Sequence, residues 1–468
     1  MKIRAPSFEV DEADPFKFDV LRRKVIAETL TELIRTADDA LVIGVDAGWG
    51  QGKTTFLRMW QQHLIGIDLD AIYFSAWESD FSGDGFVSIL GEIEIGMEKL
   101  RVKDSAPARK SFARVKKVSA GIVRRALPAA VKIATAGMLD MNEIAEDVLS
   151  EAGQKYAEER IEEYEKSKKS ISGFKSNLEK FVQDMAQGKD LKTHPLIIII
   201  DELDRCKPSY AIDVLESIKH LFSVRGVVFV VAADWTQLAN IVRARYGLGV
   251  DADAYMRRFI DISFSLPPPG KDEFIRAQFD RFELSEYFKN RQGGGARYDR
   301  DQLLDVFSYL FRACGCSLRD QERCFTLLGL AVRTTPQGFK LHSPLLAALI
   351  VLKVKSPDLY RRYLTNEAGY REVLDYFELS VIGKSYFGDS MGYSSVVEAY
   401  LATSVSDCFR DDDCVRSYME RADNEGLSQK ERARAKRVQE ILTSFEFRDS
   451  EGAFSYVAKK IDFLGERN

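Results

Sequence analysis

The feature that most constrains the fold of this chain is a glycine-rich segment between an apolar run and a helix. The apolar run, residues 40–45, predicts a short buried strand. Apolar residues at helical spacing follow from about Lys53 to His63. A strand, a glycine loop and a helix in this order predict a binding loop at the end of a strand. The segment reads Ala47-Gly48-Trp49-Gly50-Gln51-Gly52-Lys53-Thr54-Thr55.

The spacing of this segment is that of a phosphate-binding loop, the Walker A pattern, with Ala47 in place of the usual first glycine. Glycines let consecutive backbone N–H groups turn inward around phosphate oxygens, and the N-terminus of the helix adds its dipole. We expect Lys53 to reach the β- and γ-phosphates and Thr54 to offer its hydroxyl to Mg²⁺. The loop from Ala47 to Thr55 is therefore predicted to bind a nucleoside triphosphate.

A second apolar run, Leu196 to Ile200, is unbroken in the way that a central parallel strand requires. It ends in Asp201-Glu202-Leu203-Asp204-Arg205. Asp201 stands where a strand-end carboxylate would hold Mg²⁺, and Glu202 stands where a glutamate would polarise the attacking water. The adjacent acid favours ATP hydrolysis over the chemistry of a small-molecule kinase or a GTPase.

The rest of the first 270 residues alternates strands with helices, and beyond them helical spacing prevails. This order predicts an α/β fold, a doubly wound parallel-sheet P-loop NTPase core with a helical insertion and an α-helical C-terminal region. The further strands are predicted at 71–75, 227–232 and 259–266, and the further helices at 19–36, 86–100, 208–223 and 236–246. The predicted domains are the core (1–100 and 188–270), the charged insertion (101–187), a helical sensor or lid region (271–345) and a helical C-terminal region (346–468).

Composition limits the partners and the compartment. The 67 basic and 72 acidic residues give a net charge of −5, so whole-chain basicity provides no case for nucleic-acid binding. The six cysteines include no C-x-x-C pair and the four histidines are far apart, so a zinc site is not expected. We find no apolar signal core and no run of about 18 apolar residues. A reducing cytoplasm is the predicted location.

Several ordered motifs resemble those of the KAP family of P-loop NTPases. The glycine loop is similar to that family's W-G-x-G-K-[ST] signature, and the acidic strand end matches its D-[DE]-L-D-R-C form of Walker B. Further matches are Tyr73-Phe74-Ser75-Ala76-Trp77-Glu78, Val230-Val231-Ala232-Ala233-Asp234 with Gln237-Leu238, Tyr255-Met256-Arg257-Arg258-Phe259-Ile260 and Leu266-Pro267-Pro268.

The resemblance implies an additional-strand, glutamate-bearing ATPase that uses ATP and Mg²⁺. Many members of the family carry transmembrane helices between Walker A and Walker B, but the 101–187 insertion of this chain has no spanning helix. The chain is therefore expected in the cytoplasm, with at most a peripheral place at the membrane. Some bacterial members act in exclusion of bacteriophage, which makes antiphage defence, together with a protein effector, the process to test.

Three further residues are candidates for completing an ATPase site. Arg258 precedes the last strand, where a related ATPase places a finger that reaches a neighbouring subunit, and this predicts a homo-oligomer. Arg319 lies in a sensor-type helix, where it would reach the γ-phosphate in cis. Asp234 ends a strand, where it would either hold the attacking water or cap the next helix. A solvated basic residue is the plain alternative for either arginine.

Two other features of the site region leave alternatives open. Trp77 would line the site or fill the core at a strand end, with core packing favoured. Asp204 and Arg205 would pair with each other or across a subunit interface.

The insertion has a basic segment in an otherwise acidic chain. Residues 101–132 hold ten basic residues against the single Asp104, a net charge of +9, with apolar residues interleaved. Such a segment would contact anionic lipid, contact nucleic-acid phosphates, or pair with the acidic stretch 143–165 of the same chain. Intramolecular pairing carries about half of the weight, and lipid is favoured slightly over nucleic acid.

Two classes of function fit these motifs. In the first, the chain is an ATPase that couples hydrolysis to conformational change or assembly. In the second, it is a nucleotide-gated scaffold with little turnover. The motifs assign no role to residues 346–468.

Overall fold

The computed structural model describes residues 10–37, 39–99, 106–119, 151–186, 194–220, 222–267, 272–291, 296–336, 339–379, 391–404, 412–444 and 453–462. These residues belong to two compact units. The first is Val10–Pro267, called here the core unit, and the second lies within Pro268–Asn468 and is called the helical unit.

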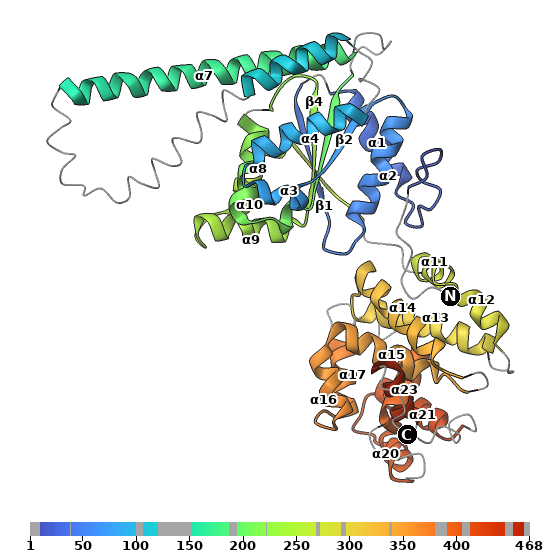
Figure 1. The fold of residues 1–468 in the computed structure, drawn as a ribbon. Coiled ribbons are helices and arrows are strands. Elements are labelled where there is room, and N and C mark those ends of the chain that lie inside the picture. Colours follow the sequence, from blue (N-terminus) through green and yellow to red (C-terminus); the bar gives the residue numbers. More distant parts are fainter. Residues whose placement is uncertain are drawn as a thin grey trace. The chain divides into compact units, whose positions relative to one another are not determined.

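The core unit is built on a sheet of five parallel strands in the order β2-β3-β4-β1-β5 (Figure 1). The arrangement confirms the predicted α/β class with a doubly wound parallel sheet. β4 lies between β1, which leads into the glycine loop, and β3, which leads into the acidic segment. The strands are β1 (Leu41–Asp46), β2 (Asp70–Ser75), β3 (Leu196–Asp201), β4 (Val227–Ala233) and β5 (Ile262–Ser265).

The central strands are apolar along their whole length because helices cover both faces of the sheet. On β3, Ile197 and Ile199 pack on one side with α1 (Lys24–Arg35) and α2 (Lys53–Gly66). Ile198 and Ile200 pack on the opposite side, because successive side chains of a strand alternate. Figure 1 shows the two helical layers. The second layer contains α4 (Gly85–Lys99), α8 (Pro208–His220) and α9 (Trp235–Tyr246).

Two elements of the core unit are shorter than the sequence pattern predicts. α1 begins at Lys24 and not at residue 19, because Arg22 has a left-handed backbone with φ +53° that interrupts helical geometry. β5 starts at Ile262, because Phe259 still belongs to the turn after α10 (Ala252–Met256).

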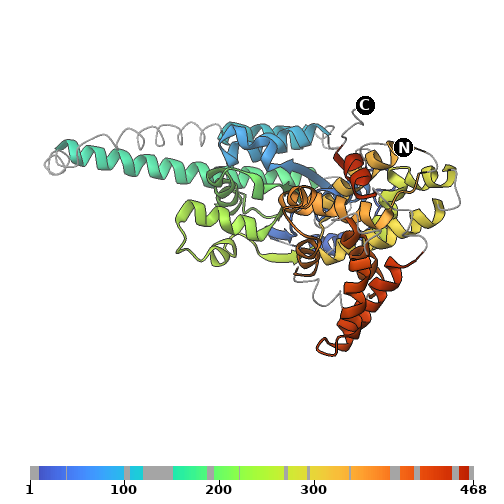
Figure 2. The ribbon, with the colours of Figure 1, turned by 90° about the horizontal axis from the view of Figure 1, so that it is seen from below.

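The described part of the insertion consists of a helix at 106–119 and the long α7 (Glu151–Ala186). Their apolar faces pack together, with the rings of Phe112 and Phe181 5.1 Å apart. α7 extends beyond the sheet (Figures 1 and 2). Residues 120–150, which include part of the predicted basic segment, lie outside the described residues. Among the helices that the structure describes, none combines the length and the apolar character needed to span a membrane.

The helical unit packs around one apolar cluster that runs from Ile275 to Ile461. α15 (Ser343–Lys355) is buried from Ser343 to Leu352, because its apolar residues surround the whole helix. The other helices are α11 (Glu273–Arg281), α12 (Leu284–Asn290), α13 (Ala296–Ala313), α14 (Leu318–Arg333), α16 (Pro357–Leu364), α17 (Tyr370–Leu379), α19 (Met391–Ser404), α20 (Asp412–Asp423), α21 (Gln429–Leu442) and α23 (Ala453–Asp462).

Candidate nucleotide-binding site

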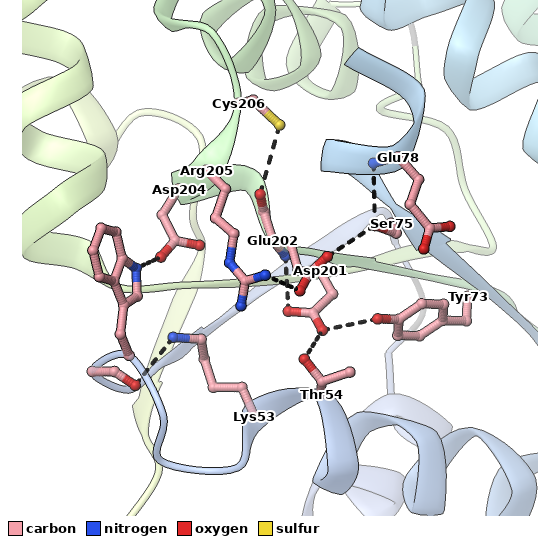
Figure 3. Close-up of polar contacts among 12 residues, drawn as sticks. Lys53, Thr54, Tyr73, Ser75, Glu78, Asp201, Glu202, Asp204, Arg205 and Cys206 are labelled. Atoms are coloured by element: carbon pink, nitrogen blue, oxygen red, sulfur yellow. Dashed lines mark hydrogen bonds and ion pairs between the residues drawn. The ribbon is translucent and has the colours of Figure 1, made fainter. Parts of the chain in front are cut away.

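The residues of the two predicted motifs, the glycine loop and the acidic segment after β3, gather at one edge of the sheet, where the parallel strands end (Figure 3). Ser75 at the end of β2 stands beside Asp201 at the end of β3, and Asp46 at the end of β1 stands beside Ala233 of β4. Ligands of open α/β sheets bind at this edge, outside the carboxyl ends of the strands.

The glycine loop has the backbone that only glycine adopts without strain. Gly50 has φ +73° and Gly52 has φ +79°, and Gly52 is the residue that precedes the first turn of α2. The first-turn N–H groups of α2 have no partners within the helix, so the loop and the helix end together offer donors for an anion. Thr54 and Thr55 lie in this first turn.

The side chain of Lys53 is folded against its own loop. It is 9% exposed, and its ammonium donates to the carbonyl oxygens of Ala47 and Gly48. Burial lowers the pKa of Lys53, while the carboxylates of Asp204 and Asp201 act in the opposite direction. The lysine is thus a buried cation whose hydrogen-bond acceptors are neutral carbonyls at the loop.

A hydroxyl and a carboxylate adjoin at the position predicted for Mg²⁺. Thr54 Oγ1 donates to Asp201 Oδ2 at 2.7 Å, and Asp201 is fully buried. Hard oxygen donors of this kind suit Mg²⁺, which keeps several waters and takes few protein ligands. The described residues contain no group of three or more His, Cys, Asp or Glu side chains arranged for a metal. Two such oxygen donors fit an ion that would take its remaining ligands from water and phosphate oxygens.

Tyr73 of β2 orients the buried carboxylate. Its hydroxyl donates to Asp201 Oδ2 at 2.9 Å, and the N–H of Glu202 donates to the other oxygen at 2.8 Å. Burial, followed by the charge of Asp201, raises the pKa of Tyr73, so the phenol stays a donor. The guanidinium of Arg58 from α2 lies 3.4 Å from the centre of the tyrosine ring and fixes its plane.

Glu202 is held by two neighbours in the core unit. Its backbone is left-handed, with φ +63°. Its carboxylate accepts a hydrogen bond from Ser75 Oγ at 3.1 Å and forms an ion pair with Arg205 at 2.6 Å (Figure 3). Ser75 also caps α3 (Ala76–Ser79) by accepting from the N–H of Glu78. The carboxylate is thus fixed beside Asp201 at the strand end.

For each of two features, one of the two alternatives from the sequence is wrong. Asp204 and Arg205 do not pair with each other: Arg205 pairs with Glu202, and Asp204 accepts from the indole N–H of Trp49. Trp77 does not fill the core, because it lies in the short helix α3, is 52% exposed and faces the guanidinium of Arg205. Turn geometry after each strand sets these contacts.

The three remaining candidates lie at three separate places in the structure. Asp234 caps α9 by accepting from the N–H groups of Thr236 and Gln237, and its charge also acts on Lys53. Arg258 is exposed over the ring of Tyr255 and, within the described residues, makes no hydrogen bond to the glycine loop. Arg319 is exposed at the start of α14 in the helical unit.

Sequence reasoning missed Tyr73 and Ser75 as parts of this site. Their spacing could have indicated a shared role, since residues two apart on a strand point to the same face. Both residues lie near the carboxyl end of β2. The missing information was the strand order, which puts β2 directly beside β3.

The model of the KAP family P-loop domain matches residues 23–337 of the chain. No curated protein matches the chain. Among solved structures, the chain is similar to the ORC2 protein of Aeropyrum pernix. The match to its ADP form has 12% identity and a TM-score of 0.27, and it covers 80% of this chain and 86% of the ORC2 chain. Its form with ADPNP and ADP is 11% identical, covers 94% of both chains and has a TM-score of 0.31. Superpositions this loose define neither the site nor its ligand.

Proposed function

The chain belongs to the KAP family of P-loop NTPases and is a nucleotide-binding protein, and from this premise we propose that it hydrolyses ATP with Mg²⁺. Lys53 and the N–H groups of the glycine loop would bind the phosphates. Thr54 and Asp201 would hold Mg²⁺, which supplies charge neutralisation at the phosphates. Glu202 would accept the proton of the attacking water.

One observation carries this proposal. The hydroxyl of Thr54 contacts Asp201 at 2.7 Å, and Glu202 follows at the same strand end with its carboxylate already oriented by Ser75 and Arg205. A phosphate loop, a metal-type oxygen pair and a fixed carboxylate thus lie at one edge of the sheet. Phosphoryl transfer to water requires this set of groups, because the protein acts mainly by positioning and by charge.

The test is phosphate release from ATP by the wild type and by Glu202→Gln. We expect the variant to bind ATP and to lose turnover by about 100-fold or more, as is usual when a general base is removed. Glu78→Gln is the matched control, because Glu78 is an exposed glutamate beside the same site. Equal phosphate release by the wild type and Glu202→Gln would sink the proposal.

The second candidate function is a nucleotide-gated scaffold. The ion pair of Glu202 with Arg205 at 2.6 Å favours it, because this contact occupies a carboxylate oxygen that a water molecule would otherwise use. This candidate requires that ATP and ADP give different oligomers while phosphate release is negligible. Size-exclusion chromatography with each nucleotide decides the matter, and identical profiles would exclude gating.

We also propose that the working form is a homo-oligomer in which Arg258 completes the site of a neighbouring subunit. Its exposed side chain on the core unit supports this role. Arg258→Ala and Glu202→Gln should each be inactive, whereas their mixture should regain part of the activity. Such a mixture contains interfaces that combine an intact Arg258 with an intact Glu202. A mixture as inactive as its parts would argue against the shared site.

The helix at 106–119 is proposed to contact the phosphates of a nucleic acid. It holds five basic residues and no acidic one, and its apolar residues Phe112 and Val115 are buried, so no apolar face remains for insertion into lipid. Glu162 and Glu165, from the acidic stretch of the chain, pair with lysines of α7 itself. Arg109, Lys110, Arg114, Lys116 and Lys117 are exposed, and Lys116 pairs with Glu94.

Duplex DNA, RNA and anionic vesicles are the three probes for this surface. A double reversal, Arg109→Glu with Lys110→Glu, should weaken nucleic-acid binding and flatten its dependence on salt. Lys168→Glu with Lys169→Glu on α7 is the matched control with the same change of charge. Binding to vesicles alone, or equal effects of both double variants, would contradict the proposal.

The process served by the ATPase is proposed from the family alone. A role in bacterial antiphage defence is what the resemblance implies, and a protein effector and a cytoplasmic location are proposed with it. It predicts that expression in a bacterial host lowers phage plaque numbers and that Glu202→Gln removes the protection. Unchanged plaque numbers with the wild type would count against this role and would leave the ATPase proposal intact.

A further inference from the structure

A buried arginine contacts the glycine loop from outside the predicted site. Arg23 is 2% exposed. Its Nη1 donates to the carbonyl of Gly52 at 3.0 Å, and its Nη2 donates to the carbonyls of Gln51 at 2.8 Å and Pro267 at 3.4 Å. Across the described chain, no carboxylate forms an ion pair with it. Its hydrogen-bond partners are therefore three backbone oxygens.

The chemistry of arginine explains why this residue type is found there. A buried cation is costly unless hydrogen bonds satisfy it, and the planar fork of guanidinium can reach two adjacent carbonyls at once. Burial lowers the pKa of Arg23 to about 10, with Asp19 opposing, so the side chain is charged at neutral pH. A lysine would offer one compact ammonium in place of the fork.

The contacts of Arg23 determine which way the loop amides point. In a trans peptide the C=O and the N–H point in opposite directions. Arg23 holds the carbonyls of Gln51 and Gly52, so the N–H groups of Gly52 and Lys53 are directed away from it. These two amides belong to the segment predicted to surround the phosphates. The Gly52 carbonyl also accepts from Phe56 in α2, whereas Arg23 is the partner recorded for the Gln51 carbonyl.

The third contact links the loop to the end of the core unit. Nη2 of Arg23 shares its donors between Gln51 and Pro267, the residue after which the chain leaves the core unit. The preceding Leu266 donates its N–H to the carbonyl of Asp46 at 2.8 Å, and Asp46 immediately precedes the loop. The glycine loop and the exit of the core unit are thus joined by the two contacts.

We propose that Arg23 is a positioning residue that sets the loop amides for phosphate binding and couples occupancy of the loop to the exit segment at Pro267. The inference rests on the proposed nucleotide site. It assigns Arg23 two measurable effects. The first is on nucleotide affinity, and the second is on the protection of the exit segment when nucleotide binds.

Affinity is measured by calorimetric titration of ADP and a non-hydrolysable ATP analogue into the full chain. Arg23→Gln should bind both nucleotides about 10- to 100-fold more weakly, since it loses hydrogen bonds from a charged donor. Arg23→Lys keeps the charge without the fork and should fall between Arg23→Gln and the wild type. Arg35→Gln is the matched control and should bind normally, because Arg35 is the exposed last residue of α1, the helix that begins directly after Arg23.

Coupling is measured by hydrogen exchange of the peptide that contains Leu266. In the wild type, saturating ADP should slow exchange of the Leu266 amide. In Arg23→Gln, saturating ADP should leave that amide unchanged although the loop is occupied. A purely structural arginine would alter exchange with and without nucleotide to the same extent, so the nucleotide-dependent difference separates the two roles.

The outcomes distinguish this inference from the function on which it rests. Absence of binding by the wild type would overturn both. Normal binding by the wild type together with equally tight binding and equal protection in Arg23→Gln would overturn the role of Arg23 alone. If Arg23→Gln fails to fold, Arg23→Lys decides, and wild-type affinity in that variant would overturn the inference.

Discussion

Two sets of buried charges, Glu398 with Arg434 in the helical unit and Arg23 with Lys53 in the core unit, have different partners. In the helical unit, Glu398 is 3% exposed and accepts from Arg434 at 2.5 Å, and Arg434 also pairs with Glu378 at 2.6 Å. In the core unit, the buried cations Arg23 and Lys53 donate to backbone carbonyls, and neither forms a recorded ion pair among the described residues.

The difference separates a structural role from a functional one. Opposite charges that satisfy each other inside a unit fix how its helices pack, and they leave little field for a ligand. Cations whose partners are neutral oxygens retain a positive field at the glycine loop, where an anionic phosphate would complete the pairing. Removing a partner of the buried ion pair in the helical unit should therefore lower the free energy of unfolding. Removing a cation beside the glycine loop should lower the affinity for nucleotide.

The largest effect on stability is expected from Arg434→Ala. The change leaves Glu398 buried without its main partner and should lower the free energy of unfolding by about 3–5 kcal/mol. Urea-induced unfolding of the full chain measures it, and ATP affinity should stay unchanged. Arg437→Ala is the control, because Arg437 lies on the same helix α21 with an exposed side chain. A loss of affinity without loss of stability would contradict the comparison.

Acid should weaken the helical unit through His342. Burial, with Lys340 adding to it, lowers the pKa of this histidine from 6.5 to about 4. The unfolded chain binds the proton more readily than the folded chain does. This histidine therefore leaves the free energy of unfolding unchanged above pH 6.5 and lowers it by about 3 kcal/mol as the pH falls toward 4. His342→Asn, which tolerates the left-handed backbone at this position, should flatten that slope. The exposed His220→Asn is the control, and an unchanged slope in His342→Asn would refute the assignment.

A smaller effect is expected from Tyr73→Phe in the core unit. The variant removes the hydrogen bond that orients Asp201. The increase in ATP affinity that Mg²⁺ produces should therefore be about tenfold smaller than in the wild type. ATP affinity without Mg²⁺ should not change. Titrating ATP at several Mg²⁺ concentrations measures both quantities, with Tyr246→Phe as an exposed control in the same unit. Equal Mg²⁺ dependence in Tyr73→Phe and the wild type would exclude an orienting role.

The sheet of the core unit could be predicted because local pattern and burial agree there. The run Leu196 to Ile200 is apolar on both faces, and the fold buries both faces. The motifs of Lys53, Thr54 and Asp201 also led to residues that the structure brings together. Asp201 is the last residue of β3, and the loop before Lys53 starts where β1 ends, at the same edge of the sheet.

Contacts between distant segments could not be predicted in the same way. Tyr73 and Asp201 are separated by 128 positions, and their hydrogen bond depends on β2 lying beside β3. Arg23 had the pattern of an ordinary basic residue near a helix start. Its burial depends on how the loop and Pro267 fold around it. Trp77 looked like a core residue, but the turn into α3 exposes it.

The most direct test of the central claim is the equilibrium affinity for ATP of the wild type, Lys53→Ala and Glu202→Gln, each measured beside its free energy of unfolding. We expect the wild type and Glu202→Gln to bind alike, and Lys53→Ala to lose affinity by about 100-fold or more, with all three equally stable. Equal affinity of all three proteins for ATP would contradict a phosphate site at the glycine loop.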